Sequence, residues 1–293
     1  MSKYYYLIAG LPNISFDDSK LPYTVSGFKE ELGNYLSDAD GQLLNLFTLK
    51  FDNENLLEQI QHPGYDPDTR GRFTYEEFNE LLEGLKNERE EEKPFTNKNK
   101  RFPPYFETFA RAFLKADEKE EKLPVLWEDY LSALYYAYAM KSKNEFVAKW
   151  FELNLNIKNI LIAITCRKYK WDRSGVVGDN PAAHKIRTSN ARDFDLGDSL
   201  EYLPAVFRIA EESDLLQRER RIDLLRWEWL EDVTVYKTFE IENVLVYFLK
   251  LEMMERWATL NKEAGERSFR QLVGAMKKGS DNVLEEFKRN NKK

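Results

Sequence analysis

The stretch FVAKWFELNLNIKNILIAI at residues 146–164 decides the fold class of this chain. Its large apolar residues recur at steps of three, four and one, which places them on one face of a helix with a period of about 3.6 residues. The residues that form this face are Phe146, Trp150, Leu153, Ile157, Ile160, Leu161 and Ile164. The pattern therefore predicts a long helix with one buried face.

A second long helix is predicted over residues 241–260, where the same spacing recurs. The apolar residues there are Ile241, Leu245, Phe248, Leu249, Met253, Trp257 and Leu260. Shorter runs of helical spacing cover residues 26–36, 54–61, 74–92, 105–115, 127–142, 201–210, 214–230 and 266–276. Alternation of period two is brief and the Asn-Gly hairpin dipeptide is absent, while residues 175–180 are typical of a loop. The chain is therefore predicted to be all-α.

Clusters of Pro, Gly and polar residues interrupt the helical pattern along the chain. These breaks fall at residues 63–71, 93–104, 123–124, 174–181 and 193–199. They divide the chain roughly into three, so we expect three helical bundles within one compact chain. The expected bundles cover residues 1–94, 95–175 and 176–293.

The composition is that of a globular protein. Of the 293 residues 14% are aromatic, with only 13 Gly and 10 Pro, which excludes disordered and collagen-like classes. Cys166 is the single cysteine, so no intrachain disulfide can form and a reducing, cytoplasmic location is expected. With 44 basic and 51 acidic side chains, the formal net charge is −7. That balance disfavours nucleic acid and anionic lipid as partners unless charge is locally segregated.

A basic residue, Lys3, precedes the apolar stretch at residues 4–11, as in a secretory signal, but the stretch lacks the other features of such a signal. Three consecutive tyrosines occupy this stretch, and Pro12 and Asn13 follow at once. The longest apolar runs, at residues 134–140 and 160–164, are well short of the about 20 residues that cross a bilayer. We therefore expect no direct membrane insertion, and any membrane association is expected to pass through other proteins.

One segment has the spacing of a metal site: DPDTRGRFTYEE at residues 66–77. Laid over a calcium-binding EF-hand loop, it places Asp66, Asp68, Gly71, Thr74 and Glu77 at the first, third, sixth, ninth and twelfth positions. Arg70 and Arg72, however, bring positive charge where calcium needs oxygen ligands. The alternative, which we favour, is a turn followed by a helix that Thr74 and Glu77 start as a capping box without any metal.

Signatures of catalysis are few. His62 and His184 are the only histidines, and neither stands in a zinc-ligand spacing. We expect His184 in a loop, and Cys166 in a buried helix, where a thiol is usually an inert packing group. The GxxxxGK(S/T), GxGxxG, HExxH and CxxC motifs are absent. We therefore assign no catalytic, cofactor-binding or metal-binding residue and expect no cofactor.

Arginines and tryptophans gather near residue 220, a composition shared with surfaces that stack nucleic-acid bases. They are Arg218, Arg220, Arg221, Arg226, Trp227 and Trp229. On a helix these arginines alternate with the acidic residues Glu219, Asp223, Glu228 and Glu231, which would neutralise the patch. The favoured interpretation is an ordinary helix with Leu215, Ile222, Leu225 and Trp229 as its core stripe. No nucleic-acid partner is expected.

Three segments share one plan, an Asn followed by an apolar helical run, at residues 43–49, 153–161 and 239–249. We expect helices starting near Asn45, Asn154 and Asn243 to occupy equivalent positions in the three bundles. An ordinary amphipathic helix with a polar cap has the same local pattern, so each segment alone is ambiguous.

The repeats resemble the C subunits of archaeal and bacterial V-type ATPases, whose eukaryotic counterparts are the d subunits. In that family acidic and Asn-containing helix starts lead into Ile- and Leu-rich helices with a basic end. The resemblance rests on NIKNIL at residues 156–161, and on YFLKLE at residues 247–252 with the later Arg256. The opening YYYLIAGLP at residues 4–12 looks more like a bacterial family of unassigned function that accompanies V-type ATPases and is thought to replace their C subunits. Residues 63–104 depart from the pattern of ordinary C subunits.

The resemblance implies a non-catalytic connector of a V-type ATPase or ATP synthase rotor. Such a protein is a funnel of three helical bundles that is seated on the membrane ring, receives the tip of the central stalk and couples the two for ion transport. It would lie in the cytoplasm, peripheral on the inner face of the membrane through other subunits. Two other classes stay open. A helical protein-interaction scaffold would show an exposed apolar groove, and an all-α enzyme would show a concave pocket with perturbed titratable groups.

Overall fold

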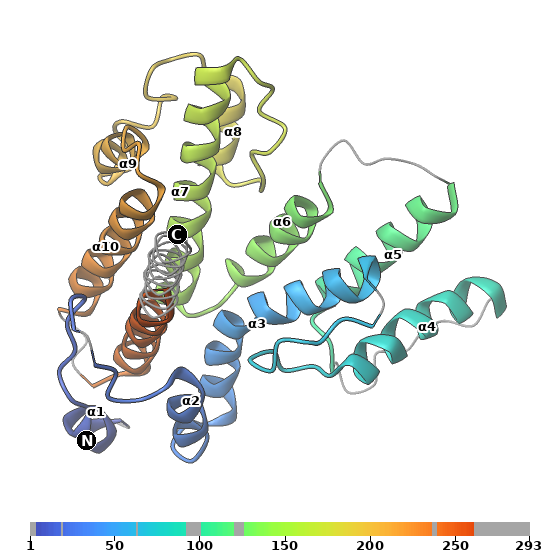
Figure 1. The fold of residues 1–293 in the computed structure, drawn as a ribbon, viewed down its shortest axis with the longest axis horizontal. Coiled ribbons are helices and arrows are strands. Elements are labelled where there is room, and N and C mark those ends of the chain that lie inside the picture. The colour runs from blue at the N-terminus through green and yellow to red at the C-terminus, as the bar shows by residue number, and fades with distance from the viewer. Residues whose placement is uncertain are drawn as a thin grey trace, which may run out of the picture. The chain divides into compact units, whose positions relative to one another are not determined.

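A computed structural model describes residues 4–18, 20–62, 64–91, 101–119, 126–235 and 239–260. Within these ranges every regular element is a helix, which confirms the predicted all-α class (Figure 1). The helices are α1 (Tyr5–Gly10), α2 (Val25–Gly33), α3 (Asp38–Gln61), α4 (Tyr75–Glu91), α5 (Pro104–Lys119), α6 (Trp127–Ala139), α7 (Glu145–Tyr169), α8 (Pro181–Thr188), α9 (Leu203–Ala210) and α10 (Leu215–Thr234). A further helical run covers residues 241–260.

The chain forms two compact units. The central unit is Leu36–Trp229, and the terminal unit joins Met1–Tyr35 to Leu230–Lys293. In the central unit α4 packs on α5, α5 on α6 and α6 on α7, while α7 also packs on α8 and α9 (Figure 1). The division into bundles at residues 1–94, 95–175 and 176–293 stays a prediction.

Two helices of the structure were not among those predicted from the periodicity. α1 is only six residues long, too short to show a repeat. α8 was missed because residues 174–181 have the composition of a break. In the structure Asn180 caps α8 by accepting a hydrogen bond from Ala183 N, and Pro181 begins the first turn of the helix. The placement of His184 in a loop is therefore wrong, since this residue lies in α8. The predicted helix at 266–276, the break at 123–124 and most of that at 93–104 lie outside the described residues.

Two buried asparagines make the same pair of hydrogen bonds in the central unit. Asn55 of α3 accepts from Asp68 N at 2.8 Å and donates to Asp68 O at 3.0 Å. Asn159 of α7 accepts from Val177 N at 3.1 Å and donates to Val177 O at 2.8 Å. A side-chain amide offers one acceptor and two donors, so it can pair with both polar groups of one backbone residue. Each long helix thus holds the loop that follows it; we refer to these two contacts as the asparagine clasps.

Each clasp has a second buried polar residue three positions earlier on the same helix face. Asp52 Oδ1 accepts from Arg72 N at 2.6 Å and from Phe73 N at 3.0 Å. Asn156 Oδ1 accepts from Asn180 Nδ2 at 2.8 Å. Residues three apart lie on one side of a helix, so both polar groups face the same loop. The units α3–loop–α4 and α7–loop–α8 therefore share one local plan.

The structure corrects the helix starts that the sequence suggested at two of the predicted repeats. Asn45 and Asn154 lie inside α3 and α7, and Asn154 donates to its own helix at Trp150 O, 2.7 Å away. The residues that cap these helices are Ser37 and Asn144. The prediction that helices start near Asn45 and Asn154 is wrong, because an Asn before an apolar run looks alike whether it caps a helix or lies within one. The third Asn, Asn243, lies near the start of the run at 241–260.

We expect Asn159→Ala to lower the free energy of unfolding by about 2–4 kcal/mol, because it leaves the buried N–H and C=O of Val177 unsatisfied. Asn154→Ala is the matched control on the same helix. The carbonyl that loses a partner there is Trp150 O, which belongs to the hydrogen-bonded backbone of α7, so the loss should be small. Denaturant unfolding measures both. Equal losses for the two variants would contradict the role assigned to the clasp.

The tryptophans on the apolar faces of the two longest predicted helices are buried, as predicted: Trp150 is 8% and Trp257 6% exposed. Truncation of either to Ala should cost about 3–5 kcal/mol of stability. Trp171 is 64% exposed, so Trp171→Ala is the control and should leave the melting temperature nearly unchanged. Unchanged melting curves for Trp150→Ala and Trp257→Ala would mean that these helix faces are misassigned.

Candidate functional site

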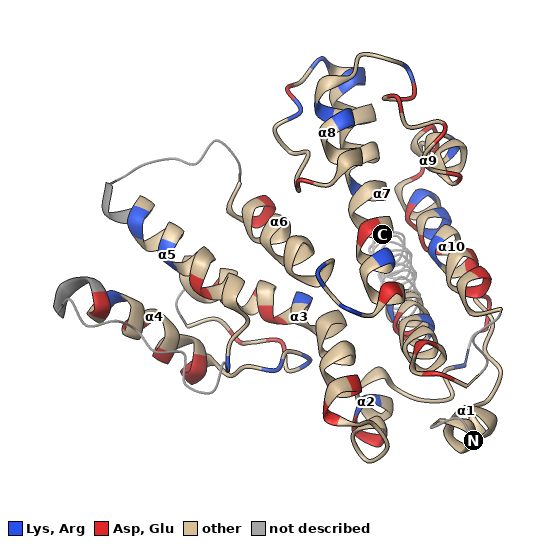
Figure 2. Ribbon diagram, turned by 180° about the vertical axis from the view of Figure 1, so that it is seen from behind, with Lys and Arg blue, Asp and Glu red and all other residues tan. Residues whose placement is uncertain are grey.

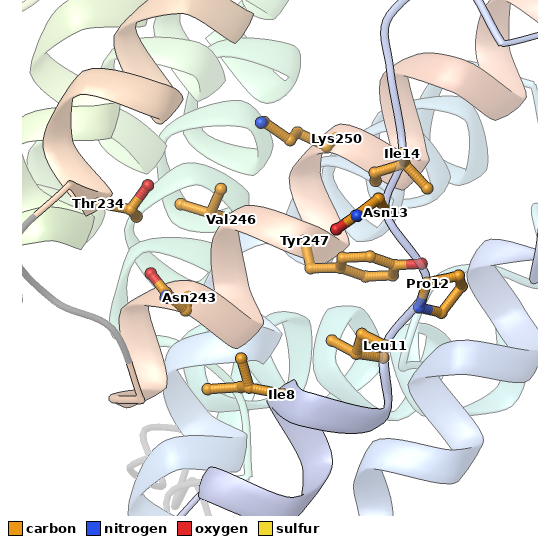
Figure 3. A pocket seen from close by; sticks show the side chains of 10 residues that line it. All are labelled: Ile8, Leu11, Pro12, Asn13, Ile14, Thr234, Asn243, Val246, Tyr247 and Lys250. Atoms are coloured by element: carbon orange, nitrogen blue, oxygen red, sulfur yellow. The ribbon is translucent and has the colours of Figure 1, made fainter.

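The terminal unit contains an open pocket of about 240 Å³ (Figure 3). Its lining residues come from α1 and the segment that follows it, from the end of α10 and from the helical run at 241–260. They are Ile8, Leu11, Pro12, Asn13, Ile14, Thr234, Asn243, Val246, Tyr247 and Lys250. Half of the lining residues are aliphatic and the others are polar or aromatic, so apolar and polar groups meet in one pocket.

The pocket lies where two distant stretches of sequence meet. Residues 4–12 provide Ile8, Leu11 and Pro12, and the run at 241–260 provides its opposite wall. The rings of Tyr5 and Phe239 reinforce this meeting, with centroids 4.7 Å apart.

Tyr247 is the polar centre of the pocket. Its ring lies beside Pro12 and Leu11 in Figure 3 and packs on Phe28 with a centroid distance of 5.1 Å. The residue is 8% exposed, and its buried hydroxyl has no hydrogen-bond partner in the part of the chain that the structure describes. Burial raises the pKa of Tyr247 to about 12, so the phenol is a neutral donor at physiological pH. A buried hydroxyl without a partner costs free energy that a bound group can recover.

Lys250 stands one helical turn beyond Tyr247 and adds a positive charge to the pocket wall. Its ammonium lies 2.9 Å from Glu231 Oε1, and the lysine is far more buried than the glutamate. Tyr247 and Lys250 are the titratable residues among those that line the pocket. The arrangement can bind an aliphatic or amphipathic group and hydrogen-bond to it. Sequence reasoning missed this site, since both residues lie within a helix that reads as ordinary amphipathic structure.

The segment at 66–77 is organised as a turn and a helix start. Thr74 N donates to Glu77 Oε2 at 2.7 Å and Glu77 N donates to Thr74 Oγ1 at 3.3 Å, which confirms the predicted capping box. The Asp68 carboxylate accepts from Arg70 Nε at 3.0 Å, and this contact lowers the pKa of Asp68. A Cβ on Gly71 would lie 2.8 Å from Asp52 Oδ1, so only glycine fits beneath α3.

Among the residues that the structure describes, no group of three His, Cys, Asp or Glu side chains is placed to hold a metal ion. His62 is exposed and lies 2.9 Å from Glu58 on its own helix, and His184 is exposed on α8. Cys166 is buried in α7, which confirms its predicted place in the core.

Two arginines of α10 pair with carboxylates, and one of the two partners, Asp223, is among the acidic residues expected to neutralise this stretch. Arg221 pairs with Glu212 at 3.1 Å, and Arg226 with the buried Asp223 at 2.9 Å. Trp229 packs on Phe146 and Trp150, and Ile222 is buried. The predicted core stripe is only partly right. Leu215 is 65% exposed, Leu225 and Trp229 are half-buried, and the fully buried apolar residues of this helix are Ile222, Trp227 and Leu230. Leu215 opens α10, and the first turn of a helix can extend past the surface on which the rest packs.

None of the helices in the described ranges combines the length and the apolar character needed to cross a membrane.

We expect Tyr247→Phe to leave the melting temperature at pH 8 unchanged or slightly raised, because it removes a buried hydroxyl without a partner. The phenol titrates near pH 10 when unfolded and at about 12 when folded, so its stabilising contribution is full below pH 10 and is lost as pH rises through 12. Wild type should therefore lose more stability than Tyr247→Phe between about pH 10 and 12. Tyr6→Phe is the exposed control. A Tyr247→Phe variant that loses as much stability as wild type would contradict the buried phenol.

Comparison with known proteins places the chain in a family without assigning it an activity. No curated protein and no solved structure matches the chain. One family model matches residues 1–280, which covers both units and both walls of the pocket. The chain therefore belongs to the family described as "Protein of unknown function (DUF2764)".

Proposed function

We propose that this protein is a non-catalytic connector in the rotor of a V-type ATPase, binding the central stalk and the membrane ring so that rotation is coupled to ion transport. The observation that carries the proposal is the meeting of residues 4–12 with the run at 241–260 around one pocket. The C-terminal stretch resembles V-type ATPase C subunits, and the opening stretch resembles a bacterial family of unassigned function that accompanies V-type ATPases. That two such motifs, far apart in sequence, line one binding surface supports a shared role for them.

The helical architecture suits a connector physically. Torque transfer needs stiff elements, and dense packing makes a protein interior resist deformation. In the central unit the asparagine clasps tie loops to long helices, and aromatic residues fill the space between helices; an example is Phe47 of α3 stacked on Phe151 of α7 at 5.5 Å. A connector acts by contact, so its site needs shape and hydrogen-bonding groups rather than an activated nucleophile.

The pocket is suited to receive one side chain of a stalk protein. Its aliphatic residues match an apolar side chain, and the exposed Asn13 amide at its edge can hydrogen-bond to a backbone group that arrives with it. Such an anchor would be one part of a wider interface, since a stable contact between proteins buries roughly 1,200–2,000 Å².

A helical scaffold unrelated to the ATPase is the second candidate, and one observation favours it. α10 exposes Leu215, Leu216 and Leu224, whose exposed fractions are 65%, 53% and 40%. Leu216 and Leu224, eight residues apart, lie on the same side of the helix, as on a surface that binds a partner helix, while Leu215 faces away from Leu224.

Deletion of the gene tests the connector directly. ATP hydrolysis by the soluble head should remain measurable, while ATP-driven ion pumping by membranes should be lost. Pumping that persists in the deletion strain would exclude the connector and leave the scaffold as the leading function.

A substitution at the edge of the pocket tests whether the stalk binds there. Asn13 is exposed at the pocket, so Asn13→Arg adds bulk and charge there without disturbing the core. We expect this variant to co-purify with central-stalk proteins at least about tenfold less than wild type, a loss of about 1.4 kcal/mol. Asn13→Ser is the matched control and should bind normally. Equal recovery with both variants would show that the stalk does not bind at this pocket.

A further inference from the structure

We propose that the end of α7 is a docking site for an anionic membrane surface, formed by Lys168, Tyr169, Lys170, Trp171 and Arg192 and supported by Arg167 and Arg173. We refer to these residues as the basic tip. The inference does not depend on the proposed function. It differs from the expectation that any membrane contact passes only through other proteins.

Positive charge is concentrated at this end of the central unit. Residues 167–192 contain seven basic and two acidic side chains, a formal charge of +5 in a chain whose net charge is −7. Figure 2 shows Lys and Arg on α8 and on the adjoining loops. Anionic lipid is attracted by such a cluster even when the protein as a whole is acidic, because screening confines the interaction to about 10 Å.

Two cations of the basic tip, Arg167 and Arg173, are bound to backbone carbonyls rather than to carboxylates. Arg167 donates to Ala191 O at 2.7 Å and to Arg192 O at 2.8 Å. Arg173 donates to Ile186 O at 2.6 Å and to Ser189 O at 2.7 Å. These hydrogen bonds bring the end of α7 against residues 186–192 while leaving the positive charges in place. The arginines of α10, by contrast, pair with Glu212 and Asp223.

Four acidic residues follow at Asp193, Asp195, Asp198 and Glu201 and lower the local positive charge, and Asp193 acts electrostatically on Arg167. Asp193 and Asp195 are held by hydrogen bonds within their own loop rather than by the cations of the basic tip. Asp193 Oδ1 accepts from Asp195 N at 3.1 Å, and Asp195 Oδ2 accepts from Ser189 Oγ. No ion pair joins the cations at 167, 168, 170, 173 and 192 to a carboxylate within the described part of the chain.

Two large aromatic rings project among these charges. Tyr169 is 54% and Trp171 64% exposed, and their rings stack with centroids 5.0 Å apart. Lys170 between them has φ 58°, a left-handed conformation that is costly for a residue with a Cβ. This backbone turns Trp171 back onto Tyr169, with Trp171 N donating to Cys166 O at 2.9 Å. Trp and Tyr beside Lys are the residues that membrane interfaces favour.

The geometry favours lipid over nucleic acid. The stacking of Tyr169 on Trp171 occupies one face of each ring and leaves only the outer faces for a base. The guanidinium of Arg167 is held over the Phe194 ring at 4.0 Å and by two carbonyls, so it is not available as a bidentate phosphate clamp. Lys168 and Lys170 are point charges on flexible stems, which suit a mobile array of lipid headgroups.

Vesicle co-sedimentation of the full-length protein tests the proposal. Wild type should sediment with vesicles of phosphatidylcholine and phosphatidylserine and not with phosphatidylcholine alone, and added salt should release it. Lys168→Gln with Lys170→Asn removes two charges while Asn tolerates the left-handed backbone, and binding should fall at least about tenfold. Trp171→Ser should also weaken binding. The matched control is Lys141→Gln with Lys143→Gln, two exposed lysines with the same spacing at the other end of α7, which should bind like wild type.

Several outcomes would overturn the proposal. These are no sedimentation with phosphatidylserine vesicles, equal losses in the tip and control variants, or retention of the tip variant on the vesicles. A single-stranded RNA oligonucleotide is included as a competing probe. Binding to that RNA without binding to vesicles would assign the basic tip to nucleic acid instead. Melting temperatures, which should be equal for all variants because the changed residues are exposed, identify any variant that fails to fold.

Discussion

The central unit depends on polar side chains buried in the faces of its longest helices. Burying an amide or a carboxylate is costly unless its hydrogen bonds are made inside the protein. Asn55 and Asn159 meet this requirement by pairing with both backbone groups of one loop residue, and Asp52 and Asn156 add a second contact to the same loops. The loops are thereby held against the helices, and the positions at which α4 and α8 begin follow from them. A specific hydrogen-bond pattern therefore determines this geometry, which general hydrophobic packing would leave variable.

The two surfaces with functional character arise in different ways. The pocket of the terminal unit combines aliphatic walls with a buried phenol, and its character comes from a polar group that folding leaves without a partner among the described residues. The basic tip arises because its arginines bind carbonyls, so that folding brings positive charges together without cancelling them. On α10, where carboxylates lie close by, a similar number of arginines produces no such surface.

Much of the fold was predictable because helix formation is signalled locally. The apolar spacing predicted most of the long helices, and the burial of Trp150, Trp257 and Cys166 follows from their places on those faces. The capping box of Thr74 and Glu77 was equally readable, since its partners lie three residues apart. The threefold repetition stays a prediction, and the helix starts expected near Asn45 and Asn154 were wrong. The asparagines of the clasps were missed, because their role depends on a contact with a residue far along the chain.

The sequence by itself determined the helical class, the main helix faces, the capping of α4 and the acidic balance of the chain, because each depends on residues within one or two helical turns or on composition alone. Only the tertiary structure decided that Asn55 and Asn159 hold loops, that Leu215 is exposed, that residues 4–12 meet Tyr247 and that Arg167 reaches residues 191–192. The contacts among these features join residues that are 13 positions apart, as for Asn55 and Asp68, to 239 positions apart, as for Ile8 and Tyr247. Local periodicity carries no information about such pairs, since which surfaces meet is settled by the packing of whole helices.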